Sequence, residues 1–262
     1  MLIVIGAKKQ PLSSLNLALL SVMFLFFAEA ISAQEKYGTG IDIIAIDYPP
    51  YTSPHLPEDG IAFKTLTDAL KQLPADGEVL HIRPKFLPPG RASFYVSRGQ
   101  WSASFYPPKQ PEPGYVWLQL DNRLVELGLF RLRYTADPAK NAADWPELAS
   151  MKGKVAIGRQ ANPEKQGLQS VLKDSQLELV QVDSPEQGFH LLAKGRVDYV
   201  FSEKVAGFYI AQELSSDEVI LEFSQNPIFT THIGLWVNRK RTAGELLFKA
   251  LKGYQPASDL VR

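Results

Sequence analysis

The chain has 262 residues, and its 28 lysines and arginines balance its 28 aspartates and glutamates. Without a basic excess, nucleic acid is a poor candidate partner. The sequence has no cysteine, which excludes disulfides, thiolate chemistry and a lipid-modified cysteine. Its four histidines, His55, His81, His190 and His232, show no metal-ligand spacing, so we expect no metal site and no cofactor.

The first 33 residues differ from the rest. Lys8 and Lys9 precede an apolar run over 15–27, which small residues follow. This layout is typical of a secretory signal peptide cleaved near Ala30 or Ala33, and the run is short for a membrane span. An uncleaved anchor is the alternative. After cleavage, one more acidic than basic side chain remains, and we expect a freely soluble, exported monomer.

Next in the chain is a βαβαβ pattern. A strand over 41–46 runs into a loop over 47–51, because Pro49 and Pro50 break regular structure. Apolar spacing and turn residues then predict a helix over 61–73, a strand over 79–82, a helix over 91–97 and a strand over 101–106.

The middle of the chain begins with a proline-rich surface loop over 107–114. Strands are predicted over 116–120 and 127–134, and residues 144–147 resemble the capped start of a helix.

Residues 154–203 carry the clearest pattern, three strands alternating with two helices. The strands are predicted over 154–158, 177–182 and 196–201. Asn162 caps a helix that starts at Pro163, and a capping box at Ser184 starts a second helix that Gly195 ends. Helices between such strands imply parallel pairing, and ligands then bind beyond the carboxyl ends of the strands.

A strand over 233–237 and a helix over 243–251 follow and are expected to return to the first part of the fold. We therefore predict an α/β fold with two lobes. Each lobe is a mostly parallel sheet flanked by helices, and the chain crosses between the lobes twice.

Five segments in order resemble a known family: 47–51, 88–92, 99–103, 151–158 and 192–200. Over about 41–251 the chain is similar to the periplasmic solute-binding proteins of family 3, the type II binding proteins associated with amino-acid ABC transporters. The resemblance implies a first lobe of 34–127 plus 222–262 and a second lobe of 128–221. It also implies that the lobes close over a small polar ligand, for an ABC permease or a membrane sensor.

The same resemblance implies roles for individual positions. Tyr48 or Tyr51 would pack on the ligand, and the loop from Arg159 to Asn162 would meet an anionic group. Glu203 stands where the family usually has an aspartate that meets a cation. One departure is the absence of arginine over 106–110, where amino-acid binders hold the α-carboxylate, so an α-amino-acid ligand is left open.

Each candidate residue also has a structural alternative. Arg159 precedes a helix N-terminus that favours an anion, but it could be a solvated surface side chain. Glu203 could instead stabilise a helix dipole, and Arg91 could form a structural ion pair. Trp101 belongs in the core. The predicted ligand-binding set is Tyr48, Tyr51, Arg91, Tyr106, Arg159, Asn162 and Glu203.

Three functions of different kinds remain. The leading one is a binding protein without catalytic activity. The second is a dehydratase-like periplasmic enzyme, with Glu203 as the acid–base group. The third is an interaction domain that has lost its ligand, with the cleft filled by Tyr106 or the loop around Lys109.

Overall fold

The computed structural model describes residues 39–72, 80–134, 145–158, 168–214 and 219–256. The predicted signal peptide, the turn with Arg159 and Asn162, and the start of the helix predicted from Pro163 lie outside these ranges, whereas residues 168–171 are described and are helical. The chain forms two compact units, residues 1–40 with 78–81 and residues 41–77 with 82–262. Apart from residues 39–40 and 80–81, the elements described below belong to the second unit. Within the described ranges, no helix is long and apolar enough to cross a membrane.

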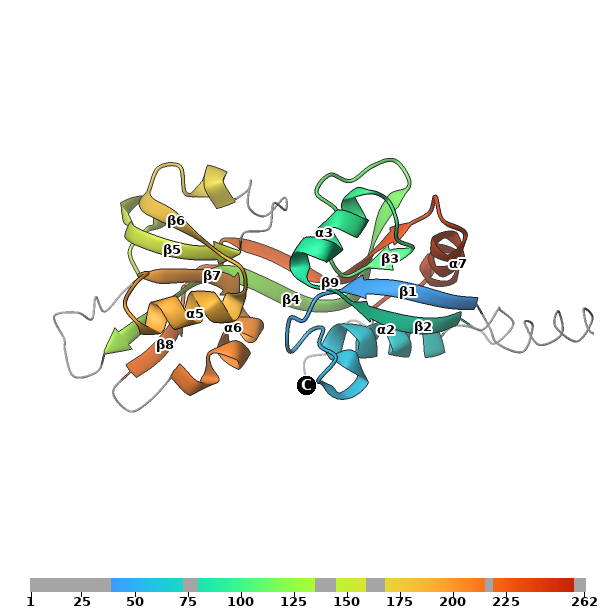
Figure 1. Ribbon diagram of the computed structural model, residues 1–262, viewed down its shortest axis with the longest axis horizontal. Helices are drawn as coiled ribbons and strands as arrows, with labels where there is room; N and C mark the ends of the chain where they lie inside the picture. The colour runs from blue at the N-terminus through green and yellow to red at the C-terminus, as the bar shows by residue number, and fades with distance from the viewer. Residues whose placement is uncertain (1–38, 73–79, 135–144, 159–167, 215–218, 257–262) are drawn as a thin grey trace, which may run out of the picture. The chain divides into compact units, whose positions relative to one another are not determined.

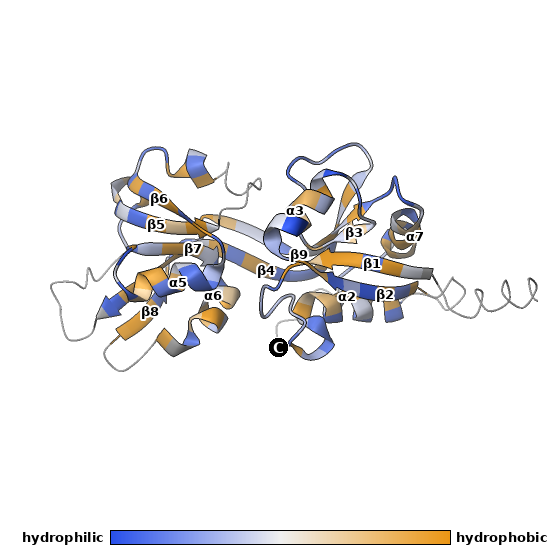
Figure 2. Cartoon of the chain, viewed as in Figure 1, coloured by the Kyte–Doolittle hydropathy of each residue, from blue (hydrophilic) through white to orange (hydrophobic). Residues whose placement is uncertain are grey.

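The first lobe contains three strands and three helices in the described chain. They are β1 (Thr39–Ala45), α2 (Ile61–Lys71), β2 (Leu80–Phe86), α3 (Pro89–Ser97), β3 (Ala103–Ser104) and α7 (Thr242–Leu251), with the 3-10 turn η1 (Pro57–Asp59) before α2. β1 is mostly apolar (Figure 2), and its Ile41, Ile43 and Ile44 are buried. It pairs in parallel with β3.

The second lobe contains β5 (Lys152–Gly158), β6 (Gln176–Val182), α5 (Pro185–Ala193), β7 (Tyr199–Glu203), α6 (Lys204–Ile210) and β8 (Val219–Phe223), with the 3-10 turns η2 (Leu148–Ser150) and η3 (Gln212–Leu214). β5 pairs in parallel with both β6 and β7, which confirms the predicted parallel pairing.

Two long antiparallel strands, β4 (Tyr115–Tyr134) and β9 (Phe229–Asn238), connect these groups (Figure 1). β9 also pairs with β3, and β4 also pairs with β7 and β8. In the described chain, the strand order is β2-β1-β3-β9-β4-β7-β5-β6, with β8 beside β4. The strands predicted over 116–120 and 127–134 are thus one strand of 20 residues.

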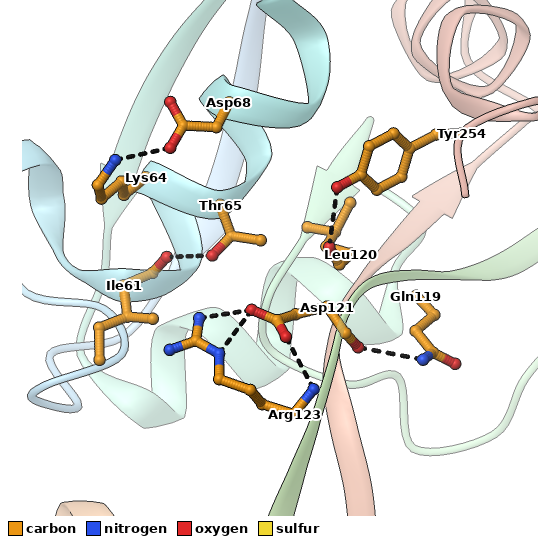
Figure 3. A network of polar contacts seen from close by, with 9 residues as sticks. All are labelled: Ile61, Lys64, Thr65, Asp68, Gln119, Leu120, Asp121, Arg123 and Tyr254. Carbon is orange, nitrogen blue, oxygen red and sulfur yellow. Dashed lines mark hydrogen bonds and ion pairs between the residues drawn. The ribbon is translucent and has the colours of Figure 1, made fainter. Parts of the chain in front are cut away.

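The register of β4 on β9 shifts between Gln119 and Leu124. Figure 3 shows the contacts made there. The Asp121 carboxylate accepts hydrogen bonds from the Arg123 backbone N–H and Nε, both at 2.7 Å. The Tyr254 hydroxyl donates to the Leu120 carbonyl at 3.3 Å. These bonds satisfy polar groups where the ladder is interrupted.

Each lobe has its own core. In the second lobe, the Phe130 ring is fully buried, and its centroid lies 5.0–5.2 Å from those of Phe189, Phe208 and Phe223. In the first lobe, Trp101 is buried and its indole N–H donates to the Val96 carbonyl at 2.9 Å. The prediction that Trp101 belongs to the core is therefore confirmed.

Local capping signals also hold. The Gln187 backbone N–H donates to the Ser184 hydroxyl oxygen at 3.3 Å at the start of α5, as predicted. Gly195 follows α5 with φ of 61°, a conformation that glycine adopts without strain.

Several element predictions were wrong in extent: β2 and β9, for example, are longer than the strands predicted over 79–82 and 233–237. The strand over 101–106 shrinks to β3, because the Ser104 side chain bonds the Tyr106 backbone N–H and carbonyl and turns the chain. β7 starts at Tyr199, because the preceding Asp198 carboxylate accepts from the Lys154 N–H at 2.7 Å. After 144–147, only the 3-10 turn η2 forms in the described residues.

A glycine substitution tests the packing of α6 on Phe130. A Cβ at Gly207 would overlap the Phe130 ring, whereas a Cβ at Gly90 in α3 would meet nothing within 4 Å. We expect Gly207→Ala to lower the free energy of unfolding by about 1–3 kcal/mol through overpacking. Gly90→Ala should leave it unchanged or raise it by up to about 1 kcal/mol. Urea unfolding of both variants measures this, and equal effects would contradict the packing described.

Candidate ligand-binding site

A cavity of about 1140 Å³ lies within the larger unit and is lined by residues of both lobes. This volume lies slightly above the usual range for small-molecule sites. The first lobe contributes the loop after β1, and the second lobe contributes the ends of β5 and β7 and the start of α5. These are carboxyl ends of parallel strands, where the sequence predicted a ligand site.

Eight aromatic side chains dominate the lining. They are Tyr48, Tyr51, Phe86, Phe105, Tyr106, Trp117, Phe201 and Trp236. The polar and charged lining includes Asp47, Thr52, Asp183, Ser184, Glu186, Ser202, Glu203, Thr231 and His232. The site therefore combines apolar faces with a few convergent polar groups.

The loop after β1 holds two of the predicted site residues. Tyr48 and Thr52 bridge each other through backbone hydrogen bonds of 2.6 and 3.1 Å, and the Thr52 hydroxyl donates to the Ile46 carbonyl at 2.9 Å. In this loop the rings of Tyr48 and Tyr51 are nearly parallel, with centroids 6.4 Å apart. A loop fixed by its own hydrogen bonds holds both rings at the cavity.

Glu203 ends β7 and caps α6. Its side chain is buried, and its carboxylate accepts from the backbone N–H groups of Val205 at 3.0 Å and Ala206 at 2.6 Å. The Tyr51 hydroxyl interacts electrostatically with this carboxylate. The helix-capping role that the sequence left open is thus present, and a ligand role for Glu203 stays a prediction.

These contacts shift the acidity of both partners. Burial raises the pKa of Glu203, and the hydrogen bonds from Ala206 and Val205 partly oppose that rise. Burial and then the Glu203 charge raise the pKa of the Tyr51 hydroxyl. Nearby, the Tyr48 hydroxyl lies 3.5 Å from the Ser202 hydroxyl. Two tyrosines of the first lobe therefore face the end of β7 in the second.

Of the other predicted site residues, one lines the cavity, one does not, and two lie outside the described residues. Tyr106 is buried in the first-lobe core and lines the cavity. Arg91 is exposed on α3 and is not part of the cavity lining, although Pro88 and Pro89 before it are. Arg159 and Asn162 lie outside the described residues. Among the residues that the structure describes, no group of histidines and acids is arranged to hold a metal ion.

Several lining residues were not predicted, above all a tryptophan pair. Trp117 on β4 is directly opposite Trp236 on β9, and their ring centroids are 5.5 Å apart. Both lie in segments that the sequence identified as strands. The strand pattern does not say which face of each strand meets the cavity.

No protein-family model matches this sequence, and no curated protein does. Solved structures share its fold. The probable amino-acid ABC transporter extracellular-binding protein ytmK from Bacillus subtilis has a TM-score of 0.57 at 14% identity, over 82% of this chain and 91% of that one. An ancestral arginine-binding protein bound to arginine has 0.55 at 14%, over 81% and 91%.

A histidine kinase sensor domain with similarity to periplasmic binding proteins has a TM-score of 0.53 at 18% identity, over 82% of this chain and 89% of that one. The two-lobed α/β fold of type II periplasmic binding proteins, predicted from the sequence, is confirmed. The resemblance to the solute-binding proteins of family 3 is confirmed at the level of the fold.

The raised pKa of Glu203 predicts a pH dependence of stability. The folded state holds this proton more tightly than the unfolded chain, whose carboxyl has the usual value of 4.5. The resulting stabilisation is complete below that value and is lost as pH rises through the raised pKa. The free energy of unfolding of the wild type, minus that of Glu203→Gln, should therefore fall as pH rises above the usual carboxyl value of 4.5.

Urea unfolding at a series of pH values measures this difference. Glu178→Gln, which removes an exposed carboxylate in β6, is the control and should show no comparable fall. A difference for Glu203→Gln that is flat or rises with pH would contradict the burial of this carboxyl.

Proposed function

We propose that this chain is a periplasmic solute-binding protein that captures a small polar ligand, amino-acid-like or another small carboxylate or amine, between its two lobes. The observation that supports this best is the cavity of about 1140 Å³, lined from both lobes at the carboxyl ends of parallel strands. Tyr48, Tyr51, Tyr106 and Glu203 are the proposed ligand contacts in the described chain. Arg159 and Asn162 are proposed from the sequence alone.

The proposal includes export and a downstream partner. The basic and apolar start of the chain supports a signal peptide removed near Ala30 or Ala33. The proposed lobes are 34–127 plus 222–262 and 128–221. The similar structures include an ABC transporter binding protein and a sensor-kinase domain, which supports delivery to an ABC permease or a membrane sensor.

The other two functions have less support. A general acid–base residue must reach the proton it transfers, whereas the Glu203 carboxylate is already bonded by two backbone N–H groups. A ligand-free interaction domain would have its cleft filled by its own side chains. The size of the cavity is evidence against that, and Lys109 is not part of its lining.

A ligand panel tests capture. Purified protein incubated with amino acids, amines, organic acids and sugars should show a specific rise in melting temperature. A ligand at 100 times its Kd adds roughly 2.7 kcal/mol to the free energy of unfolding, which corresponds to a rise of several degrees. Native mass spectrometry of fresh material should find a bound small molecule. No shift with any compound, and no bound mass, would contradict the proposal.

The aromatic contact can be tested once a ligand is found. Tyr48→Ala removes a ring that faces the cavity, and we expect the Kd to rise roughly tenfold, because aromatic contacts are worth about 1–2 kcal/mol. Tyr209→Ala removes an exposed ring on α6 outside the lining and is the matched control. Isothermal titration calorimetry measures both. Equal Kd values for the two variants would exclude Tyr48 from the site.

A further inference from the structure

The charge of the cavity lining differs from that of the chain. Basic and acidic side chains are equal in number over the whole sequence. In the described lining, by contrast, four side chains are acidic, Asp47, Asp183, Glu186 and Glu203, and none is lysine or arginine. The only imidazole there is that of His232. The described lining therefore offers no permanent positive charge to an anionic ligand.

The four carboxylates come from different parts of the fold. Asp47 follows β1 in the first lobe, Glu203 ends β7, and Asp183 and Glu186 lie at the start of α5. A cavity with charges of one sign and low-dielectric walls concentrates the electric field inside it. Three of these side chains are exposed, but Glu203 is buried, and water screens the charge of a buried group less.

The aromatic lining, like the carboxylates, favours a positively charged ligand. The faces of tryptophan and tyrosine rings are negative and attract cations, most strongly where water is excluded. The pairs Trp117–Trp236 and Tyr48–Tyr51 border the cavity. Of the two cations predicted for the site, Arg91 stays outside the lining and Arg159 lies outside the described residues. A carboxylate ligand would thus lie among ring faces and other carboxylates.

We propose that the ligand of this site is an organic ammonium ion with an apolar or aromatic body, not a carboxylate. The inference rests on the proposed function, since it names the chemical class captured by the same cavity. The rings hold the body and the ammonium group, and the carboxylates of both lobes supply the opposite charge.

Probes that share one aromatic body test the charge preference. 2-Phenylethylammonium and benzyltrimethylammonium carry a positive charge, and 3-phenylpropanoate carries a negative one. Isothermal titration calorimetry and saturation-transfer NMR at low salt should give at least one ammonium probe a Kd ten or more times lower than that of 3-phenylpropanoate. The affinity of that ammonium probe should fall as salt is added.

A matched pair of double variants tests the lining charge. Asp183→Asn with Glu186→Gln removes two lining carboxylates, and Asp174→Asn with Glu178→Gln removes two exposed ones of the same lobe outside the lining. The lining variant should bind the ammonium probe roughly two- to tenfold more weakly, because each exposed ion pair is worth about 0.2–1 kcal/mol. The control variant should bind it as the wild type does. Equal affinities for the two variants would overturn the charge argument.

Two further outcomes overturn the inference. One is binding of 3-phenylpropanoate as tight as that of the ammonium probes, above all if Arg159→Ala abolishes it. The other is failure of both ammonium probes to bind at millimolar concentration. In either case the proposed capture function stands if any compound of the ligand panel binds, and it falls only if the whole panel gives no response.

Discussion

The antiparallel pairing of β4 with β9 is the constraint on which both lobes depend. Each of the two strands also pairs with a strand of one lobe, β9 with β3 and β4 with β7. Residues 115–119 of β4 pair with 234–238 of β9, and residues 124–127 pair with 229–232. In the pairing of β4 with β7, Leu127 of β4 is directly opposite Glu203 of β7. A slip of one residue in this register would turn side chains to the opposite face of the sheet. The place of Glu203 in the cavity is therefore set by the pairing of β4.

The interruption of that pairing over 120–123 is itself well ordered by hydrogen bonds. Asp121 holds Arg123 through its backbone and side chain, Gln119 Nε2 donates to the Asp121 carbonyl at 3.1 Å, and Tyr254 holds the Leu120 carbonyl (Figure 3). A break in the ladder lets a long strand bend and twist locally. The two halves of β4 can thus belong to different lobes, while hydrogen bonds satisfy several polar groups at the break between them.

Much of the fold could be predicted because its signals are local. A capping serine with proline after it, as at Ser184, acts within one turn of helix. Strand limits failed where a distant contact decided them, as when Asp198 bonds Lys154. Tyr48 and Tyr51 were predicted from the resemblance to the solute-binding proteins of family 3, and both line the cavity. The Trp117–Trp236 pair was missed, since its position depends on a register between segments more than 100 residues apart.

The hydrogen bonds that Glu203 already accepts limit how many it can accept from a ligand. An ionised carboxylate has about four lone-pair positions, and two backbone N–H groups of α6 occupy two of them. At most about two positions are left for donors from a ligand. Glu203 therefore needs other groups of the lining to fix the orientation of a ligand. Extended contact with flat surfaces does this, and the described lining offers the rings of Tyr48, Tyr51, Trp117 and Trp236 among its aromatic side chains.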